Sequence, residues 1–204
     1  FDRGLAWCYG FNHEEAVRCF EKALEQDRLC AMGHWGIAYA SGSFYNKPWE
    51  WFGDDERTKV VKTCYHHAQT ALELSATATP LETQLIAALC EKHAAGQAKE
   101  ITELAQWEAN YSNRMRALQK GFADDLDVIC LTAESMMNLS RWKLWDFHQG
   151  VPAVGALTEA SIELLEQALL LIEENQLGTH TGILHFYIHA LEMSPQPEQE
   201  LLAL

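Results

Sequence analysis

A short packing motif recurs along this sequence, and it constrains the fold more than any other feature. Gly4-Leu5-Ala6-Trp7 returns 32 residues later as Gly36-Ile37-Ala38-Tyr39, and Ala133-Glu134-Ser135-Met136 is a weaker echo. Each copy reads small-x-small-large. The small residues let a neighbouring helix approach closely, and the large residue fills the space beyond the contact. The motif therefore predicts pairs of antiparallel helices.

A second pattern marks the returning helix of each pair. It reads Ala-x3-Phe-x2-Ala-Leu at residues 16–24, and degenerate forms follow at 64–72 and 161–169. Apolar residues spaced by three and four dominate the chain, which predicts an all-α fold and, because the pair repeats, an array of stacked helix pairs (an α-solenoid). We expect one such domain over residues 1–204, as a fragment of a longer repeat protein. The predicted helices span 2–10, 13–27, 30–42, 54–74, 80–95, 98–120, 125–139, 156–174 and 180–193.

Two aromatic-rich segments interrupt the pattern. Residues 43–56 and 141–155 contain the Gly and Pro residues of turns, yet they also carry four of the seven tryptophans. We expect the first segment to fold over the helices rather than to form a free linker. Their aromatic side chains line a ligand or peptide pocket, or they simply cap the array. Trp7 and Trp35, in contrast, stand at positions that predict core packing.

Charge and cysteine content restrict the partners. The formal net charge of -14 makes the surface repel phosphate backbones and anionic lipids, so we expect neither nucleic acid nor a membrane surface as a partner. No apolar run approaches the roughly 20 residues that a membrane-spanning helix needs. The six cysteines form no CxxC pair and predict reduced thiols in a cytoplasmic protein.

Several stretches carry a family resemblance. The run from Phe11-Asn12-His13-Glu14-Glu15-Ala16 through 30–36 to Tyr45-Asn46 resembles a family of large bacterial and fungal tetratricopeptide-repeat proteins of unassigned function, and residues 122–139, 142–150 and 180–195 also look like that family. The first repeat departs from the usual pattern at Arg28, where a proline is expected, and His180-Thr181-Gly182 stands where His-Pro-Gly is expected. The resemblance implies a helical-repeat fold and leaves the activity open.

One helical stretch has the spacing of metal ligands. His185 and His189 are four residues apart, so both imidazoles reach the same face of a helix, and Glu192 follows on that face. Such a pair binds a divalent transition metal such as Zn, Fe, Mn or Cu, or it is merely a solvated histidine face. Further ligand candidates lie on other helices: His34, Glu134 and His13. Glu192 and His180 are predicted to support the ligands from behind.

Other chemistry finds no support in the sequence. Phe186 stands where a HExxH protease needs its glutamate, and neither a Gly-rich phosphate loop nor a GxSxG motif is present. We therefore assign no catalytic residue, and no cofactor beyond a possible transition metal. His93 lies near a helix end, where the dipole favours a cationic imidazole, and we expect a structural role for it.

Two hypotheses remain from the sequence. The first is an interaction scaffold whose concave groove binds a peptide or protein partner, with an acidic surface favouring basic partners. The alternative is a metal-binding protein or metal-dependent enzyme that uses the His and Glu cluster on the same face.

Overall fold

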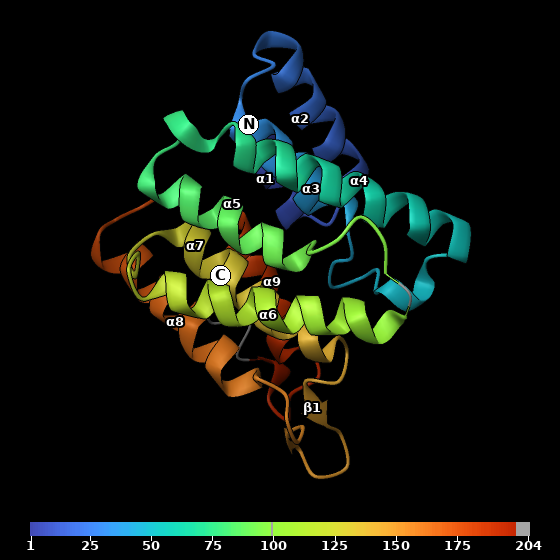
Figure 1. Cartoon of the computed structure of the whole chain (residues 1–204). Helices are drawn as coiled ribbons and strands as arrows, with labels where there is room; N and C mark the ends of the chain where they lie inside the picture. The colour runs from blue at the N-terminus through green and yellow to red at the C-terminus, as the bar shows by residue number, and fades with distance from the viewer. Residues whose placement is uncertain (99, 199–204) are drawn as a thin grey trace. The chain divides into compact units, whose positions relative to one another are not determined.

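The fold is built almost entirely from helices. The computed structural model describes residues 1–98 and 100–198, and these contain nine α-helices, three short 3-10 helices and two short strands (Figure 1). The α-helices are α1 (Asp2–Tyr9), α2 (His13–Gln26), α3 (Ala31–Ser41), α4 (Asp54–Glu73), α5 (Pro80–Lys92), α6 (Ile101–Gln119), α7 (Leu126–Met137), α8 (Thr158–Glu174) and α9 (Thr181–Leu191). The 3-10 helices are η1 (Trp49–Trp51), η2 (Ser75–Thr77) and η3 (Asn138–Ser140), and the strands are β1 (Trp145–Asp146) and β2 (Val151–Pro152). The prediction of a mostly helical chain is confirmed.

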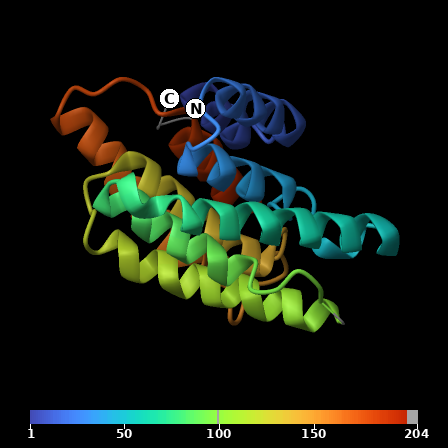
Figure 2. The same cartoon turned by 45° about the horizontal axis from the view of Figure 1, so that its top comes forward.

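The chain divides into two compact units. Unit 1 is Phe1–Arg114 and unit 2 is Met115–Leu204, so the boundary falls within α6. In unit 1 each of the helices α1 to α4 packs against the next, and α3 also contacts α1 and α5. Figure 2 shows α4 running beside α3 and α5. The expectation of a single domain over residues 1–204 stays a prediction.

The small residues of the repeated motif meet one aromatic ring. Gly4 of α1 and Gly36 of α3 both face Phe20 of α2, and a Cβ atom on either glycine would lie 2.6 or 2.4 Å from that ring. Phe20 is fully buried. The close approach predicted from the sequence is thus present in unit 1. Trp35 is also buried, as predicted. The core position predicted for Trp7 is wrong, because 36% of the Trp7 surface is exposed and Trp7 is not among the buried residues of α1.

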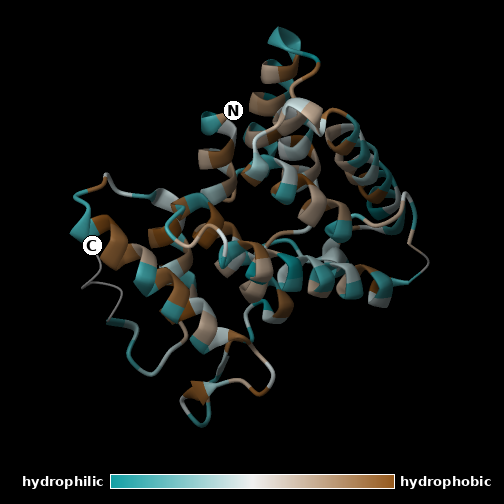
Figure 3. Cartoon of the chain, turned by 60° about the vertical axis from the view of Figure 1, so that its left-hand side comes forward, coloured by the Kyte–Doolittle hydropathy of each residue, from teal (hydrophilic) through white to brown (hydrophobic). Residues whose placement is uncertain are grey.

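Helix ends follow local signals in the sequence. The Asn12 side chain accepts a hydrogen bond from the Glu15 amide at the start of α2, and Thr79 and Glu82 form a capping box at the start of α5. Hydrophobic and hydrophilic residues alternate along most helices, as expected for helices that bury one face (Figure 3). In residues 1–98 and 100–198, both ends of each of the nine α-helices agree with the predicted ranges to within three residues.

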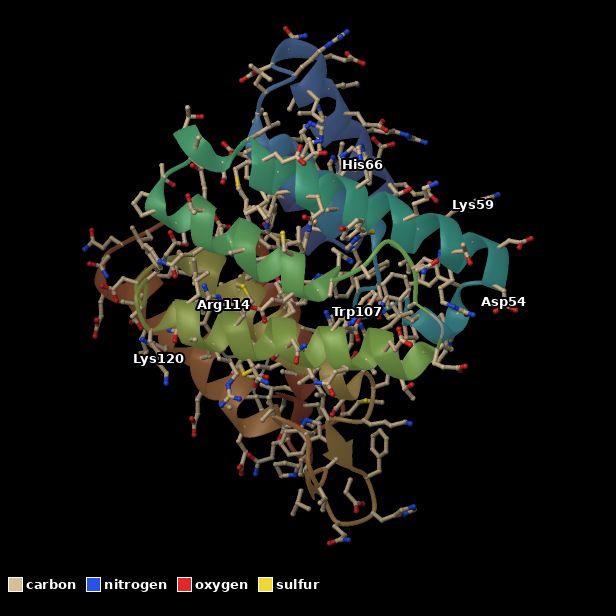
Figure 4. The ribbon with its side chains drawn as sticks, in the orientation of Figure 1. Asp54, Lys59, His66, Trp107, Arg114 and Lys120 are labelled. Atoms are coloured by element: carbon tan, nitrogen blue, oxygen red, sulfur yellow. The ribbon has the colours of Figure 1, made fainter. Side chains whose placement is uncertain are left out.

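The segment between α3 and α4 folds onto unit 1. Trp49 and Phe52 are buried and pack with Val61 of α4 and Leu104 of α6, and Trp107, labelled in Figure 4, packs against the same cluster. The expectation that this segment covers the helices is confirmed.

Unit 2 contains a second aromatic connection. Within unit 2, α7 packs against α8 and α9, and α8 packs against α9. β1 and β2 form an antiparallel pair in which Trp145 lies opposite Pro152. The Trp145 indole N–H donates to the Ala190 carbonyl at 2.7 Å, which ties this hairpin to α9.

No helix in residues 1–98 and 100–198 has both the length and the apolar composition needed to cross a bilayer.

Candidate functional site

A pocket with a volume of about 630 Å³ lies in unit 1. Its walls come from residues 11–14 and Val17 at the start of α2, 40–42 at the end of α3, the connection after α3, and the first turns of α4. Small-molecule sites in proteins span about 300–1,000 Å³. The pocket therefore has room for a small ligand or for a few residues of a peptide.

One wall of the pocket is aromatic. The His13 imidazole stacks on the Phe44 ring with 3.7 Å between ring centroids and 12° between ring planes. His13 Nδ1 lies 2.9 Å from the Ala40 carbonyl oxygen, and because a carbonyl only accepts, Nδ1 carries the proton. Phe11 extends the wall with its centroid 5.7 Å from that of Phe44. His13, predicted as a metal ligand, thus forms a hydrogen bond with the C-terminal part of α3 and stacks on Phe44.

One corner of the pocket is charged. Lys47 Nζ donates to Glu56 Oε1 at 2.7 Å, and the same nitrogen lies 4.1 Å from the centroid of the Phe52 ring. The hydrogen bond from Lys47 lowers the pKa of the Glu56 carboxyl, so this carboxylate is ionised at neutral pH. Glu14 contributes a further carboxylate to the lining.

Buried polar groups hold the backbone behind the pocket. Lys92 Nζ donates to the Ser43 carbonyl at 3.1 Å, and the Ser43 hydroxyl donates to Glu108. All three residues are at least 94% buried. Gly42 packs against the His93 imidazole, because a Cβ atom added to Gly42 would lie 3.0 Å from His93 Cε1. These contacts fix the connection that carries Phe44 and Lys47.

His34 pairs with a histidine that the sequence analysis did not select. Its Nδ1 lies 2.9 Å from Nδ1 of His67 on α4. Burial lowers the pKa of His34, and burial together with the neighbouring imidazoles lowers the pKa of His67 to about 4. Both rings are therefore neutral at pH 7, and one donates the hydrogen bond that the other accepts. The two histidines are 33 positions apart in the sequence, so no local pattern predicts their pairing.

In unit 2, His185, His189 and Glu192 lie together as their spacing predicts. The two Nε2 atoms are 3.1 Å apart, and His189 Nδ1 lies 2.9 Å from Glu192 Oε1. A carboxylate only accepts, so it fixes the proton of His189 on Nδ1 and directs the lone pair of Nε2 toward His185.

The other predicted residues of unit 2 have different contacts. Glu134 is buried and accepts a hydrogen bond from the Asn138 side chain at 3.1 Å. His180 caps α9 by accepting from the Ile183 amide, and its Nε2 lies 3.1 Å from Asp127 Oδ1. His180 thus caps the N-terminus of α9, where Thr181 stands in place of the proline expected from the resemblance.

The predicted metal ligands are distributed over both units. His13 and His34 belong to unit 1, whereas Glu134, His185 and His189 belong to unit 2. Over residues 1–98 and 100–198, no group of three or more His, Cys, Asp or Glu side chains is arranged to hold a metal ion. The full five-residue metal set stays a prediction.

Most of the pocket was not predicted from the sequence. Phe44, Lys47 and Glu56 lie in or beside the aromatic segment, where the cluster of turn and aromatic residues was the only signal.

Comparisons of the chain with protein-family models, with curated proteins and with solved structures find no match. The tetratricopeptide-repeat resemblance therefore stays a prediction.

Proposed function

We propose that unit 1 is a tetratricopeptide-like binding module that holds a short peptide segment of a partner protein in the pocket beside His13. The observation that carries this proposal is a pocket of about 630 Å³ whose lining combines an aromatic wall with a charged corner. Peptide sites combine apolar surface for side chains with a few polar groups that fix orientation. The consecutive packing of α1 to α4, with α3 in contact with both α1 and α5, supports the array.

Charge supports a basic partner. Glu14 and Glu56 line the pocket with Lys47 as their one cationic neighbour among the lining residues, and the chain carries a formal charge of -14. Long-range attraction speeds the encounter with a positively charged segment. The peptide we expect to bind therefore contains apolar or aromatic side chains next to Arg or Lys.

The proposal is tested by calorimetric titration with the capped tripeptide acetyl-Phe-Arg-Leu-amide. We expect saturable binding of one peptide per chain. Val17→Trp, which fills the pocket from α2, should weaken binding at least tenfold, equivalent to about 1.4 kcal/mol. Thr63→Trp, at an exposed position of α4 that does not line the pocket, is the matched control and should bind as the wild type does. Equal binding by both variants would place the peptide elsewhere.

A second candidate function is metal binding in unit 2, and the geometry of His185 and His189 favours it. Two nitrogens that are each about 2.0–2.1 Å from a tetrahedral Zn²⁺ lie about 3.3 Å apart. The observed separation of 3.1 Å is close to that value, and Glu192 holds the tautomer of His189 that coordinates through Nε2. Water or a bound partner would complete the coordination of such a two-histidine site.

Elemental analysis of protein purified without a histidine tag tests the metal proposal. We expect one transition metal per chain, lost in the His185→Ala/His189→Ala double variant and retained in His148→Ala, an exposed histidine outside the pair. Glu192→Gln should weaken Zn²⁺ affinity by about 10–100-fold, as loss of a supporting carboxylate typically does. A metal-free wild type that also fails to bind added Zn²⁺ would rule the site out.

A further inference from the structure

The charged corner of the pocket has the composition of a cation subsite. The face of the Phe52 ring and the Glu56 carboxylate both contact the same ammonium group, at 4.1 Å and 2.7 Å. An aromatic face and a carboxylate together attract ammonium and guanidinium groups. Phe52 is itself held in place by Trp49, whose ring centroid is 5.1 Å away. The buried Phe52 ring therefore forms a well-packed surface beneath the cation.

The cation that occupies this corner belongs to the chain and is able to leave. Side-chain exposure is 38% for Lys47 and 49% for Glu56, and ion pairs this exposed contribute little to stability. The Lys47 backbone is fixed separately, because its amide donates to the Phe44 carbonyl at 3.1 Å and its carbonyl accepts from the Phe44 amide at 3.3 Å. The four-carbon stem of Lys47 can thus swing outward while the turn and the aromatic wall stay in place.

Departure of Lys47 changes the charge of the pocket. With the ammonium withdrawn, the carboxylates of Glu14 and Glu56 remain in the lining without a lysine among them. An incoming Arg or Lys side chain restores the balance and gains the same ring contact, and Arg adds a second N–H for the carboxylate. An acidic side chain at this position would meet like charge.

We infer that Lys47 occupies, in the ligand-free protein, the subsite that receives a cationic side chain of the bound peptide, and that Lys47 competes with the peptide for Phe52 and Glu56. This inference rests on the proposed peptide-binding function of the pocket. Lys47 thereby acts as an internal competitor that sets the affinity for basic segments.

The test compares acetyl-Phe-Arg-Leu-amide with acetyl-Phe-Glu-Leu-amide by calorimetric titration. Lys47→Met should bind the Arg peptide several-fold more tightly than the wild type, because the competitor is gone, and Glu56→Gln should bind it about tenfold more weakly. Lys59→Met is the control for net charge, since Lys59 is an exposed lysine on α4, the helix that carries Glu56, and does not line the pocket (Figure 4).

The outcomes separate this inference from the function on which it rests. Binding of the Arg peptide that is sensitive to Val17→Trp, but no tighter in Lys47→Met than in Lys59→Met, overturns the competitor role and leaves the pocket as the peptide site. A wild-type preference for the Glu peptide that disappears in Lys47→Met would make Lys47 an anion-binding residue and also overturn the inference. Failure of both peptides to bind overturns both proposals.

Discussion

Gly36→Ala is expected to destabilise unit 1 by about 1–3 kcal/mol, the usual cost of overpacking a well-packed core. The added Cβ atom would lie 2.4 Å from Phe20 Cδ1 and 2.5 Å from Phe20 Cγ. Phe20 is fully buried and touches Gly4 on the neighbouring helix, so its ring has little room to move. Thermal and urea unfolding should show the loss, with a melting temperature lower by on the order of 2–10 °C.

Gly10→Ala is the matched control for this prediction. Gly10 lies in the same unit, has φ of -89°, and its added Cβ would meet only backbone oxygens at 3.7 Å. Its substitution should change stability by a few tenths of a kcal/mol at most. A Gly36→Ala protein as stable as Gly10→Ala would contradict the close helix contact between α2 and α3.

Acid is expected to destabilise unit 1 through His93. This side chain is 2% exposed, and burial, with a smaller contribution from the neighbouring Lys92 charge, lowers its pKa to about 3. The folded state therefore leaves His93 neutral while the unfolded state protonates it near pH 6.5. The stabilising contribution is fully present above pH 6.5 and decreases as the pH falls from 6.5 toward 3. The free energy of unfolding should fall by about 1.4 kcal/mol per pH unit from this group.

Two variants isolate the His93 contribution from simple loss of packing. His93→Gln and His93→Phe differ in volume and polarity, so their stabilities at pH 7 will differ. Both remove the titrating group, so both should reduce the pH dependence of the unfolding free energy by about one proton between pH 6 and 4. Urea unfolding at several pH values measures this slope. An unchanged slope in both variants would show that His93 is already protonated in the folded protein at these pH values.

The burial of His93 reverses an expectation from the sequence. Its position at the end of α5 predicts a cationic imidazole stabilised by the helix dipole, and His93 is indeed the residue that ends this helix. The dipole contributes a few tenths to one kcal/mol at an exposed site, whereas full burial disfavours the charged form far more strongly. The prediction of a cationic His93 is wrong because its burial behind Gly42 depends on contacts distant in sequence.

Helices were predictable because their signals are local. The apolar spacing around Phe20, the Asn12 cap and the Thr79–Glu82 capping box each act within one or two helical turns. The association of His189 with His185 and Glu192 was predictable for the same reason, since all three lie on or at the end of α9.

The pocket was not predictable because its parts meet only after folding. Lys92 and Glu108 read as ordinary surface residues of amphipathic helices, yet both are buried behind Ser43. No periodicity in the sequence links Ser43 to a lysine 49 residues away. The aromatic segment after α3 suggested a pocket or a cap, and only the packing of Phe44 on His13 distinguishes a pocket wall there.

Backbone amide NMR spectra recorded during titration with acetyl-Phe-Arg-Leu-amide test whether unit 1 binds a peptide in the pocket beside His13. We predict saturable shifts concentrated in residues 11–17, 40–47 and 52–60, which line or flank the pocket. Saturable shifts confined to α7, α8 and α9, or no saturable shifts at peptide concentrations up to about 1 mM, where binding energies fall to about 4 kcal/mol, would contradict it.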